Sequence, residues 1–297
     1  MILYGEAAAL HKPIQWPAPT KRPAPRTGRH RLVEVFFPSP PSVLGTEEVA
    51  ISLALLLVAA LYSSVGHGGA SGYLAVLSLT SFATMEGAWL KQHAWCLNLI
   101  VAAIAFYHYR RAGHHIPRLT AIFVAASVPL ALLGGYLSVD GVVYDTLLSL
   151  TLVWASFRLL GIGQDIDGLP STDPSLAQAM PFGAGIGLVS GLVGVGGGIF
   201  LSPLIMLKRW AAPKTAAATA ALFIWVNSAA GLVGSSLSGQ WMVEPTTLAP
   251  FAGAVLIGGF VGSRLGAEIA DQRTVRLVLV VVLLLAAGRR LIEVAGL

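Results

Sequence analysis

Charged residues are scarce in this chain of 297 residues. Asp, Glu, Lys and Arg together make up 11% of it, whereas hydrophobic residues make up 55%. Soluble domains carry about 25% charged residues, so this composition excludes an ordinary soluble domain. The few charges cluster between long apolar runs, which is typical of a polytopic membrane protein. The sequence therefore predicts an all-α protein with several helices that cross a membrane.

Cysteine and intramembrane carboxylates are also nearly absent. Cys96 is the only cysteine, which excludes an internal disulfide framework and a CxxC redox pair. Four acids, Glu86, Asp140, Asp145 and Glu244, lie near the ends of apolar runs or in loops. A buried acidic relay and a cation site made of carboxylates are therefore poorly supported. We expect no metal and no cofactor.

The net charge of +5 does not indicate nucleic acid. Basic residues lie in the loops, where they set the topology of a membrane protein against anionic lipid. We therefore expect a small anionic substrate and membrane lipids as partners. The sequence leaves a homo-oligomer open.

Residues 1–48 differ from the rest of the chain. The stretch "HKPIQWPAPTKRPAPRTGRHR" is rich in Pro, Lys and Arg and has no helical period. It also lacks the apolar core and small-residue cleavage site of a signal peptide. We predict a disordered Pro/Arg-rich tail. A solvated linker and a contact with anionic lipid both fit this composition.

Ten apolar segments follow, in two sets of five. The first repeat, residues 49–162, and the second, residues 179–297, are separated by a polar linker at 163–178. The expected segments are 49–65, 70–84, 92–109, 119–137 and 143–161, then 180–194, 197–207, 215–236, 247–266 and 274–294.

Matching motifs in the two sets predict an internal duplication. "VGHGGASG" (65–72) is echoed by "VGVGGGIF" (193–200), "AWCLN" (94–98) by "FIWVN" (223–227), and "LLGGYL" (132–137) by "LIGGFV" (256–261). The motifs occur in the same order in both halves. A duplicated membrane protein built in this way is a common plan for secondary transporters.

The second segment of each set is too short to cross a membrane. A span needs about 20 apolar residues, so residues 70–84 and 197–207 are predicted to be half-helices. Each forms a hairpin with the segment before it, and three full spans follow. A hairpin returns the chain to the face where it began, and three spans then carry the chain to the opposite face. The second half therefore starts from the opposite face, which predicts two inverted repeats.

Loop charges give this plan an orientation. The loops that carry Arg110, Arg111 and Arg118 and residues 208–214 fall on one face, which the positive-inside rule makes cytoplasmic. Lys91, at the start of an apolar segment, falls on the opposite face.

The glycine-rich breaks predict an anion site. Backbone that leaves a helix at membrane depth must line a cavity or be buried in protein, and glycine lets another group approach it. Each half-helix then begins with free N–H groups and a partial positive charge, which suits an anion. The alternative is close helix packing, which we expect at Gly134, Gly135, Gly258 and Gly259.

Several polar side chains accompany the breaks. Asn98 and Asn227 hold matching positions, and each could donate to an anion or tie two helices together. His67 has no counterpart, since Val195 replaces it in the second copy. It could bind an anion, carry a proton, or be a neutral ring bonded to a carbonyl.

The hydroxyl candidates also have two interpretations. Ser71 and Ser202 lie in the first turns of the half-helices and could cap them or contact a ligand. Thr219 and Ser228 could line the site or bond to their own helix. The substrate-binding candidates are Gly66, His67, Gly68, Gly69, Ser71, Asn98, Gly196, Gly197, Gly198, Ser202, Thr219, Asn227 and Ser228.

Three motifs resemble one known family. "GLVGVGGGIFLSPLIML" (191–207) resembles the signature of the TauE/SafE family of sulfite-exporter-like permeases, and "AAATAALFIWVNSAAG" (216–231) resembles its second motif. "VGHGGASGYLAVLSL" resembles a weaker first copy. The resemblance covers about residues 49–295. It implies movement of sulfite, sulfonates and related sulfur-containing anions across bacterial membranes. Ala220, where the family often has Ser, and His67 depart from the pattern and bear on the substrate.

We therefore predict a secondary transporter that exports small anions by alternating access, in a bacterial plasma or inner membrane. It is predicted not to be an enzyme. The alternatives are a passive anion channel and a rhomboid-like intramembrane protease. The latter rests on "GASG" (69–72), with Ser71 as nucleophile and His67 as base. No later span carries a matching histidine, because the last one in the chain is His115.

Overall fold

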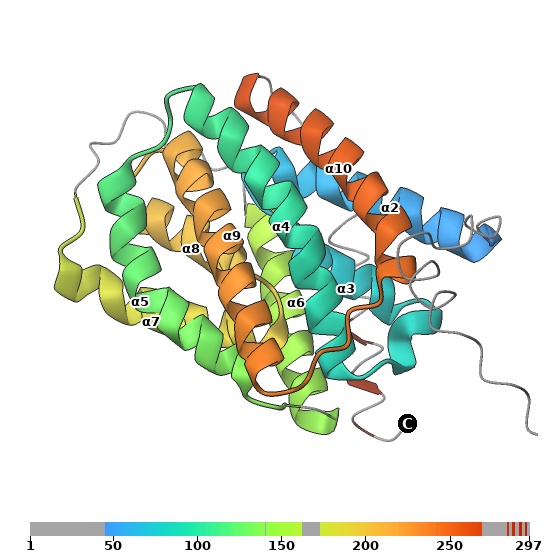
Figure 1. The fold of residues 1–297 in the computed structure, drawn as a ribbon. Coiled ribbons are helices and arrows are strands. Elements are labelled where there is room, and N and C mark those ends of the chain that lie inside the picture. Colours follow the sequence, from blue (N-terminus) through green and yellow to red (C-terminus); the bar gives the residue numbers. More distant parts are fainter. Residues whose placement is uncertain are drawn as a thin grey trace, which may run out of the picture. The chain divides into compact units, whose positions relative to one another are not determined.

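The computed structural model describes residues 45–139, 141–161 and 173–268, with isolated positions beyond them at 284, 287, 288, 291, 292 and 295. Every regular element in these ranges is a helix (Figure 1). The predicted all-α fold is therefore confirmed. The predicted N-terminal tail, apart from its last residues, most of the linker and the expected segment at 274–294 lie outside the described residues.

The helices follow the expected order. In the first half they are α2 (Thr46–Ser63), α3 (Ala70–Ser78), the 3₁₀ helix η1 (Ser81–Thr84), α4 (Gly87–Arg111), α5 (Pro117–Tyr136) and α6 (Gly141–Gly161). In the second half they are α7 (Leu176–Val193), α8 (Gly198–Leu207), α9 (Pro213–Leu237) and α10 (Pro245–Glu268).

Local sequence explains where several helices begin. Pro117 and Pro213 occupy the first positions of α5 and α9, where a missing N–H costs nothing. At α7, Ser175 and Gln178 form a reciprocal capping box. Because of this cap, α7 begins inside the stretch that the sequence suggested as polar linker.

Five helices are long and apolar enough to cross a membrane, namely α2, α5, α7, α9 and residues Pro245–Ala267 of α10. Large apolar side chains lie exposed on several helices, such as Leu57 of α2, Phe157 of α6 and Ile257 of α10. Water would disfavour such a surface, whereas lipid accommodates it. α4 is not among the five, since its first turns carry Lys91, Gln92 and His93.

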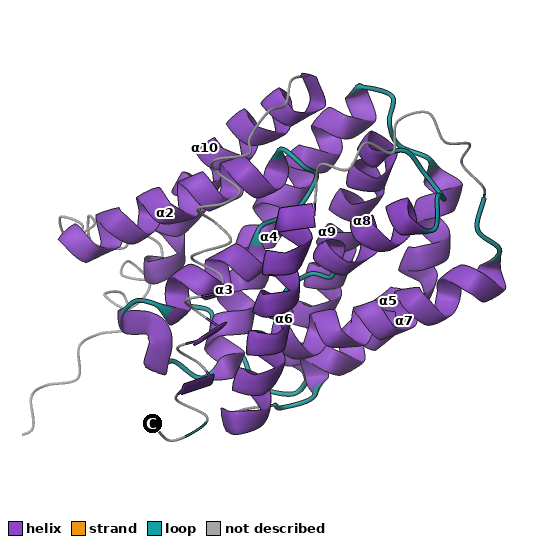
Figure 2. Cartoon of the chain, turned by 180° about the vertical axis from the view of Figure 1, so that it is seen from behind, coloured by secondary structure: helices purple, strands orange, loops and turns teal. Residues whose placement is uncertain are grey.

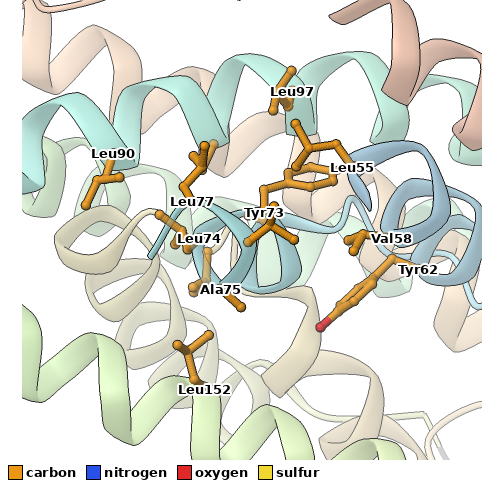
Figure 3. Packing of buried hydrophobic residues seen from close by; sticks show 14 of the residues in the cluster. Leu55, Val58, Tyr62, Tyr73, Leu74, Ala75, Leu77, Leu90, Leu97 and Leu152 are labelled. Carbon is orange, nitrogen blue, oxygen red and sulfur yellow. The ribbon is translucent and has the colours of Figure 1, made fainter. Parts of the chain in front are cut away.

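Both segments predicted to be half-helices form short helices, although the first ends at Ser78 and not at residue 84. α3 has nine residues and α8 has ten. α3 returns the chain to the beginning of α2, because Ser81 N, just after α3, donates to Glu47 Oε1 in the first turn of α2 (3.1 Å). All nine residues of α3 are buried. Figure 3 shows its apolar side chains packed among those of α2, α4 and α6, including Leu55, Leu97 and Leu152.

Helices from different halves pair with each other. α5 packs on α7, and α10 packs on α2 (Figure 2). Glycine stripes allow both contacts, since a Cβ on Gly183 would lie 2.8 Å from Phe123 O and one on Gly262 would meet Ala60 O. Gly134, Gly135, Gly258 and Gly259 likewise face neighbouring helices closely, which confirms the packing role predicted for them.

α4 and α9 meet at the centre of the described fold and run in opposite directions. Gln92 Nε2 donates to Ser235 Oγ (2.9 Å), and Asn98 Nδ2 donates to Ser228 Oγ (3.3 Å), so the contacts ascend α4 while they descend α9. An inverted repeat requires such an antiparallel pair of equivalent helices. The inverted repeat itself stays a prediction, because it concerns the two faces of a membrane.

Candidate functional site

In each half the helical path is interrupted by a short break, at residues 64–69 between α2 and α3 and at residues 194–197 between α7 and α8. Each break ends on a glycine. Gly69 precedes α3 with φ of 103°, and Gly197 precedes α8 with φ of 83°. Both angles lie in the left-handed region that L side chains rarely adopt. These glycines therefore explain how the chain reverses direction inside a buried part of the protein.

The two breaks face the same residues of α4 and α9. A Cβ on Gly68 would fall on Asn98 Oδ1 and lie 3.0 Å from Ile224 Cγ2. A Cβ on Gly196 would lie 2.6 Å from Asn98 Nδ2 and 2.9 Å from Ile224 Cγ2. Two glycines at equivalent places in the two halves thus abut one asparagine and one isoleucine. The fold brings the breaks together as the sequence predicted.

The place where the two breaks meet α4 and α9 is called the junction below, and Asn98 forms hydrogen bonds across it. Its Oδ1 accepts from Ala70 N at the start of α3 (3.0 Å), while its Nδ2 donates to Ser228 Oγ on α9 (3.3 Å). The side chain is fully buried. Of the two interpretations open at the sequence level, the structure shows the tie between helices for Asn98.

His67 links the first break to the second. Its Nε2 lies 3.1 Å from Gly198 O, and its Nδ1 lies 2.9 Å from Val65 O. Carbonyl oxygens only accept, and a neutral imidazole has one N–H, so a neutral ring can donate to one of the two. An imidazolium would donate to both. His67 is therefore bonded to carbonyls.

The first break is satisfied by hydroxyl groups of its own half. Tyr73 Oη donates to Gly68 O (2.6 Å), and Tyr109 Oη donates to Ser64 O (2.7 Å). Ser71 Oγ lies 2.8 Å from Tyr62 Oη. Of the two interpretations open at the sequence level for Ser71, the structure does not show a cap on α3, because the hydroxyl bonds to the tyrosine of α2.

The structure does not show the hydrogen bond between Ser71 and His67 that the protease alternative requires. Ser71 Oγ is paired with Tyr62 Oη, and both ring nitrogens of His67 face carbonyl oxygens. A serine nucleophile needs a hydrogen bond to its base, and neither residue is placed to make it.

The remaining candidates divide into three kinds. Ser202 and Asn227 are buried and have no hydrogen-bond partner within the described part of the chain. Thr219 Oγ1 lies 3.4 Å from Thr120 Oγ1 and so contacts α5 rather than a break. Gly66 faces the first turns of α9, since a Cβ on it would lie 2.5 Å from Ala217 O.

Lys91 is a neighbour of the second break that sequence reasoning assigned to a loop face. It lies within α4, and its side chain is fully buried. Its Cα and Cβ pack against Gly194, its Nζ lies 5.9 Å from the centre of the Trp95 ring, and Nζ donates to Leu137 O (3.3 Å). The spacing of Lys91, Trp95 and Asn98 on one helical face was the signal that could have shown this.

Two further residues of the junction were missed. Ile224 packs against three glycines of the breaks, and Ser190 of α7 lies beside Gly197. Neither stands out in sequence, because an isoleucine and a serine are ordinary residues of apolar helices. Among the described residues, no group of three or more His, Cys, Asp or Glu is placed to hold a metal ion.

Comparison with known proteins identifies the family. Residues 51–290 match the model of the family described as sulfite exporter TauE/SafE. The chain is 34% identical over 253 residues to the probable membrane transporter protein y4hK of Sinorhizobium fredii, covering 84% of this chain and all of that protein. It is 31% identical over 113 residues to the probable membrane transporter protein YunE of Bacillus subtilis, a match that covers 36% of this chain and 38% of that protein. No solved structure matches. With these matches and five helices able to span a membrane, the chain belongs to the TauE/SafE sulfite exporter family and is a multi-pass membrane transporter.

Proposed function

We propose that the protein is a secondary transporter that exports small anions, namely sulfite, sulfonates or related sulfur-containing anions, by alternating access. One observation carries the proposal. The breaks that lead into α3 and α8, one from each half, approach the same pair of residues, because Gly68 and Gly196 both abut Asn98 and Ile224. The family description adds sulfite as the substrate class.

The physical argument concerns charge. The first turn of a helix leaves N–H groups without intrahelical partners and carries about half a positive charge. Two such ends at one buried junction attract an anion and repel a cation. Residues of the described part of the breaks, 64–69 and 194–197, include no carboxylate that would reverse this preference.

The mechanism uses the pairing of helices between the halves. Asn98, Ser228 and the neighbouring glycines are buried, so a substrate reaches the junction only when helices separate on one face or the other. Because α5 packs on α7 and α10 packs on α2, these two contacts are the surfaces between the halves that would have to shift when one half moves against the other. An inside-negative potential assists anion export by about 2.3 kcal/mol per charge per 100 mV.

Purified protein in liposomes tests this proposal. Electrogenic flux is measured for sulfite, sulfoacetate, thiosulfate, sulfate, acetate and chloride. We expect saturable current with the sulfur oxyanions and sulfonates. Flux of chloride or acetate alone, or none from folded protein, would refute the substrate class.

A second measurement separates a carrier from a channel. Liposomes preloaded with unlabelled sulfite are given labelled sulfite outside. A carrier accelerates uptake of the label by exchange, whereas a passive pore lets the two fluxes proceed independently. Absence of this acceleration would favour the channel.

A further inference from the structure

The two breaks differ in how their polar groups are satisfied. At the first break, Asn98, Tyr73 and Ser71 all have hydrogen-bond partners. At the second, Asn227, the counterpart of Asn98, has no partner for Oδ1 or Nδ2 within the described residues. Asn227 therefore does not cap α8 as Asn98 caps α3. A duplicated fold does not require this difference.

Two more unpartnered polar groups belong to the same region. They are the indole N–H of Trp95 on α4 and the hydroxyl of Ser190 on α7, neither with a partner within the described parts of the chain. Trp95, Ser190 and Asn227 are each fully buried. Buried polar atoms without partners are few in native proteins, and each one that occurs calls for an explanation.

Contacts with glycines place the three groups around the start of α8. A Cβ on Gly197 would lie 3.5 Å from Ser190 Cβ and 2.8 Å from Phe223 Cε1. Asn227 follows Phe223 by one turn of α9, on the same side of the helix. One turn further, a Cβ on Gly231 would lie 2.6 Å from Cζ2 of Trp95. Asn227 thus stands between the N-terminus of α8 and the indole.

Lys91 adds a positive charge beside this group. It precedes Trp95 by one turn of α4, its backbone packs on Gly194 of the second break, and its Nζ lies 5.9 Å from the Trp95 ring centre. Its Nζ also donates to Leu137 O at the end of α5. A charged side chain buried among the helices of a membrane protein usually marks the path of a substrate or ion.

We propose that the anion is held at the second break, by the indole N–H of Trp95, the hydroxyl of Ser190 and the amide of Asn227, with Lys91 as the cation that draws it in. The first break is the structural partner. This inference rests on the proposed anion transport. It makes the binding site asymmetric although the fold is duplicated, and it assigns three residues that the family motifs did not indicate as a set.

The number of hydrogen-bond donors at the proposed site also favours one kind of anion. Three side-chain donors from three helices, together with the first N–H groups of α8, suit an anion with three oxygens on one centre. Sulfite and the sulfonate group have this form. Chloride offers no directional acceptors, and a carboxylate offers only two oxygens.

Three variants test the assignment by removing the donors one at a time: Trp95→Phe, Ser190→Ala and Asn227→Leu. Sulfite transport into liposomes is measured over a range of concentrations, and each variant is also melted in detergent. We expect the KM for sulfite to rise at least tenfold in each variant. Thermal stability should not fall in Ser190→Ala, because the hydroxyl that is removed has no partner to lose.

Matched controls remove similar groups elsewhere. Ser149→Ala removes another buried hydroxyl, on α6, that has no partner among the residues the structure describes. Trp225→Phe changes a partly exposed tryptophan of α9, and Lys214→Gln changes an exposed lysine, for comparison with Lys91→Gln. These three controls should keep the wild-type KM, whereas Lys91→Gln should raise it.

The outcomes separate the two proposals. If the wild-type protein carries no anion of the panel, the proposed function fails. If it carries sulfite, and Ser190→Ala and Asn227→Leu are folded with unchanged KM, only the site assignment is overturned. If Trp95→Phe does not fold, the other two variants still decide.

Discussion

Two asparagines at equivalent positions illustrate how a residue's role depends on its surroundings. Asn98 bonds to Ala70 N and Ser228 Oγ, whereas Asn227 has no partner among the described residues. Both side chains are fully buried. Removal of the first leaves other polar atoms unpaired, whereas removal of the second does not, so the two substitutions should have different consequences.

Asn98→Ala should therefore lower stability more than Asn227→Ala. The first variant leaves the buried N–H of Ala70, at the start of α3, without its acceptor. The loss of a partner for such a group costs about 1–3 kcal/mol. Thermal unfolding of the purified proteins in detergent measures the difference. Equal melting temperatures would contradict the tie between helices described for Asn98.

Gly196→Ala should abolish transport. Its φ is +73°, and its new Cβ would lie 2.6 Å from Asn98 Nδ2, so the methyl group would displace the side chain at the junction. We expect a loss of about 1–3 kcal/mol of stability together with loss of anion flux. Gly185→Ala on α7, where nothing lies within 4 Å of the new Cβ, is the control and should transport normally.

At the scale of helices, glycine stripes decide which elements pair. The stripe Gly258, Gly262 and Gly266 of α10 lies against backbone oxygens of α2 and its C-cap Ser64. The stripe Gly183, Gly187 and Gly191 of α7 lies against backbone oxygens of α5. Small residues at this spacing let helix backbones approach closely in a membrane. The two stripes explain why helices far apart in sequence lie side by side in Figure 2.

Gly262→Ala should weaken the α10–α2 contact. The added Cβ would meet Ala60 O and lie 2.5 Å from Ser63 Oγ, so the helices must separate. Overpacking of this kind costs about 1–3 kcal/mol. Gly253→Ala on the same helix meets nothing within 4 Å and should leave stability unchanged or higher, because alanine favours helix. Thermal melting of the pair measures the contrast, and equal losses would contradict the role of the stripe.

At the scale of the whole molecule, the contacts place one pair of equivalent helices, α4 and α9, in opposite directions. Asn98 meets Ser228 and Gln92 meets Ser235, so α4 and α9 are antiparallel. Equivalent helices that run antiparallel end on opposite sides of the described fold. In a membrane, the C-terminal ends of α4 and α9 are therefore predicted to face different compartments.

Cysteine labelling tests this topology. Ala112 at the end of α4 and Ser236 in the last turn of α9 are both exposed. In a Cys96→Ala background, Ala112→Cys and Ser236→Cys should react with a membrane-impermeant maleimide from opposite sides of oriented vesicles. Labelling of both from one side would show that the two halves are not inverted.

Several features of this protein follow from sequence alone. The scarcity of charge and the long apolar runs determine a helical membrane protein, because a lipid environment tolerates few charges. The glycine clusters and the short segments after them determine α3 and α8, since nine or ten residues cannot cross a bilayer. The packing role of Gly134 and Gly258 also follows from small-residue spacing, which is a local property of a helix.

Other features were decided only by tertiary structure. By its position Ser71 could cap α3 or contact a ligand, but its hydroxyl bonds to Tyr62, and Lys91, which the sequence placed among the loop charges, is buried against Gly194. The unpartnered set of Trp95, Ser190 and Asn227 comes from three different helices. Local patterns fix helix positions and breaks, because the hydrogen bonds of a helix join residues four apart. Which side chains meet, and which are left without partners among the described residues, depends on contacts between different segments, up to 131 residues apart for His67 and Gly198, and these arise only when the helices pack.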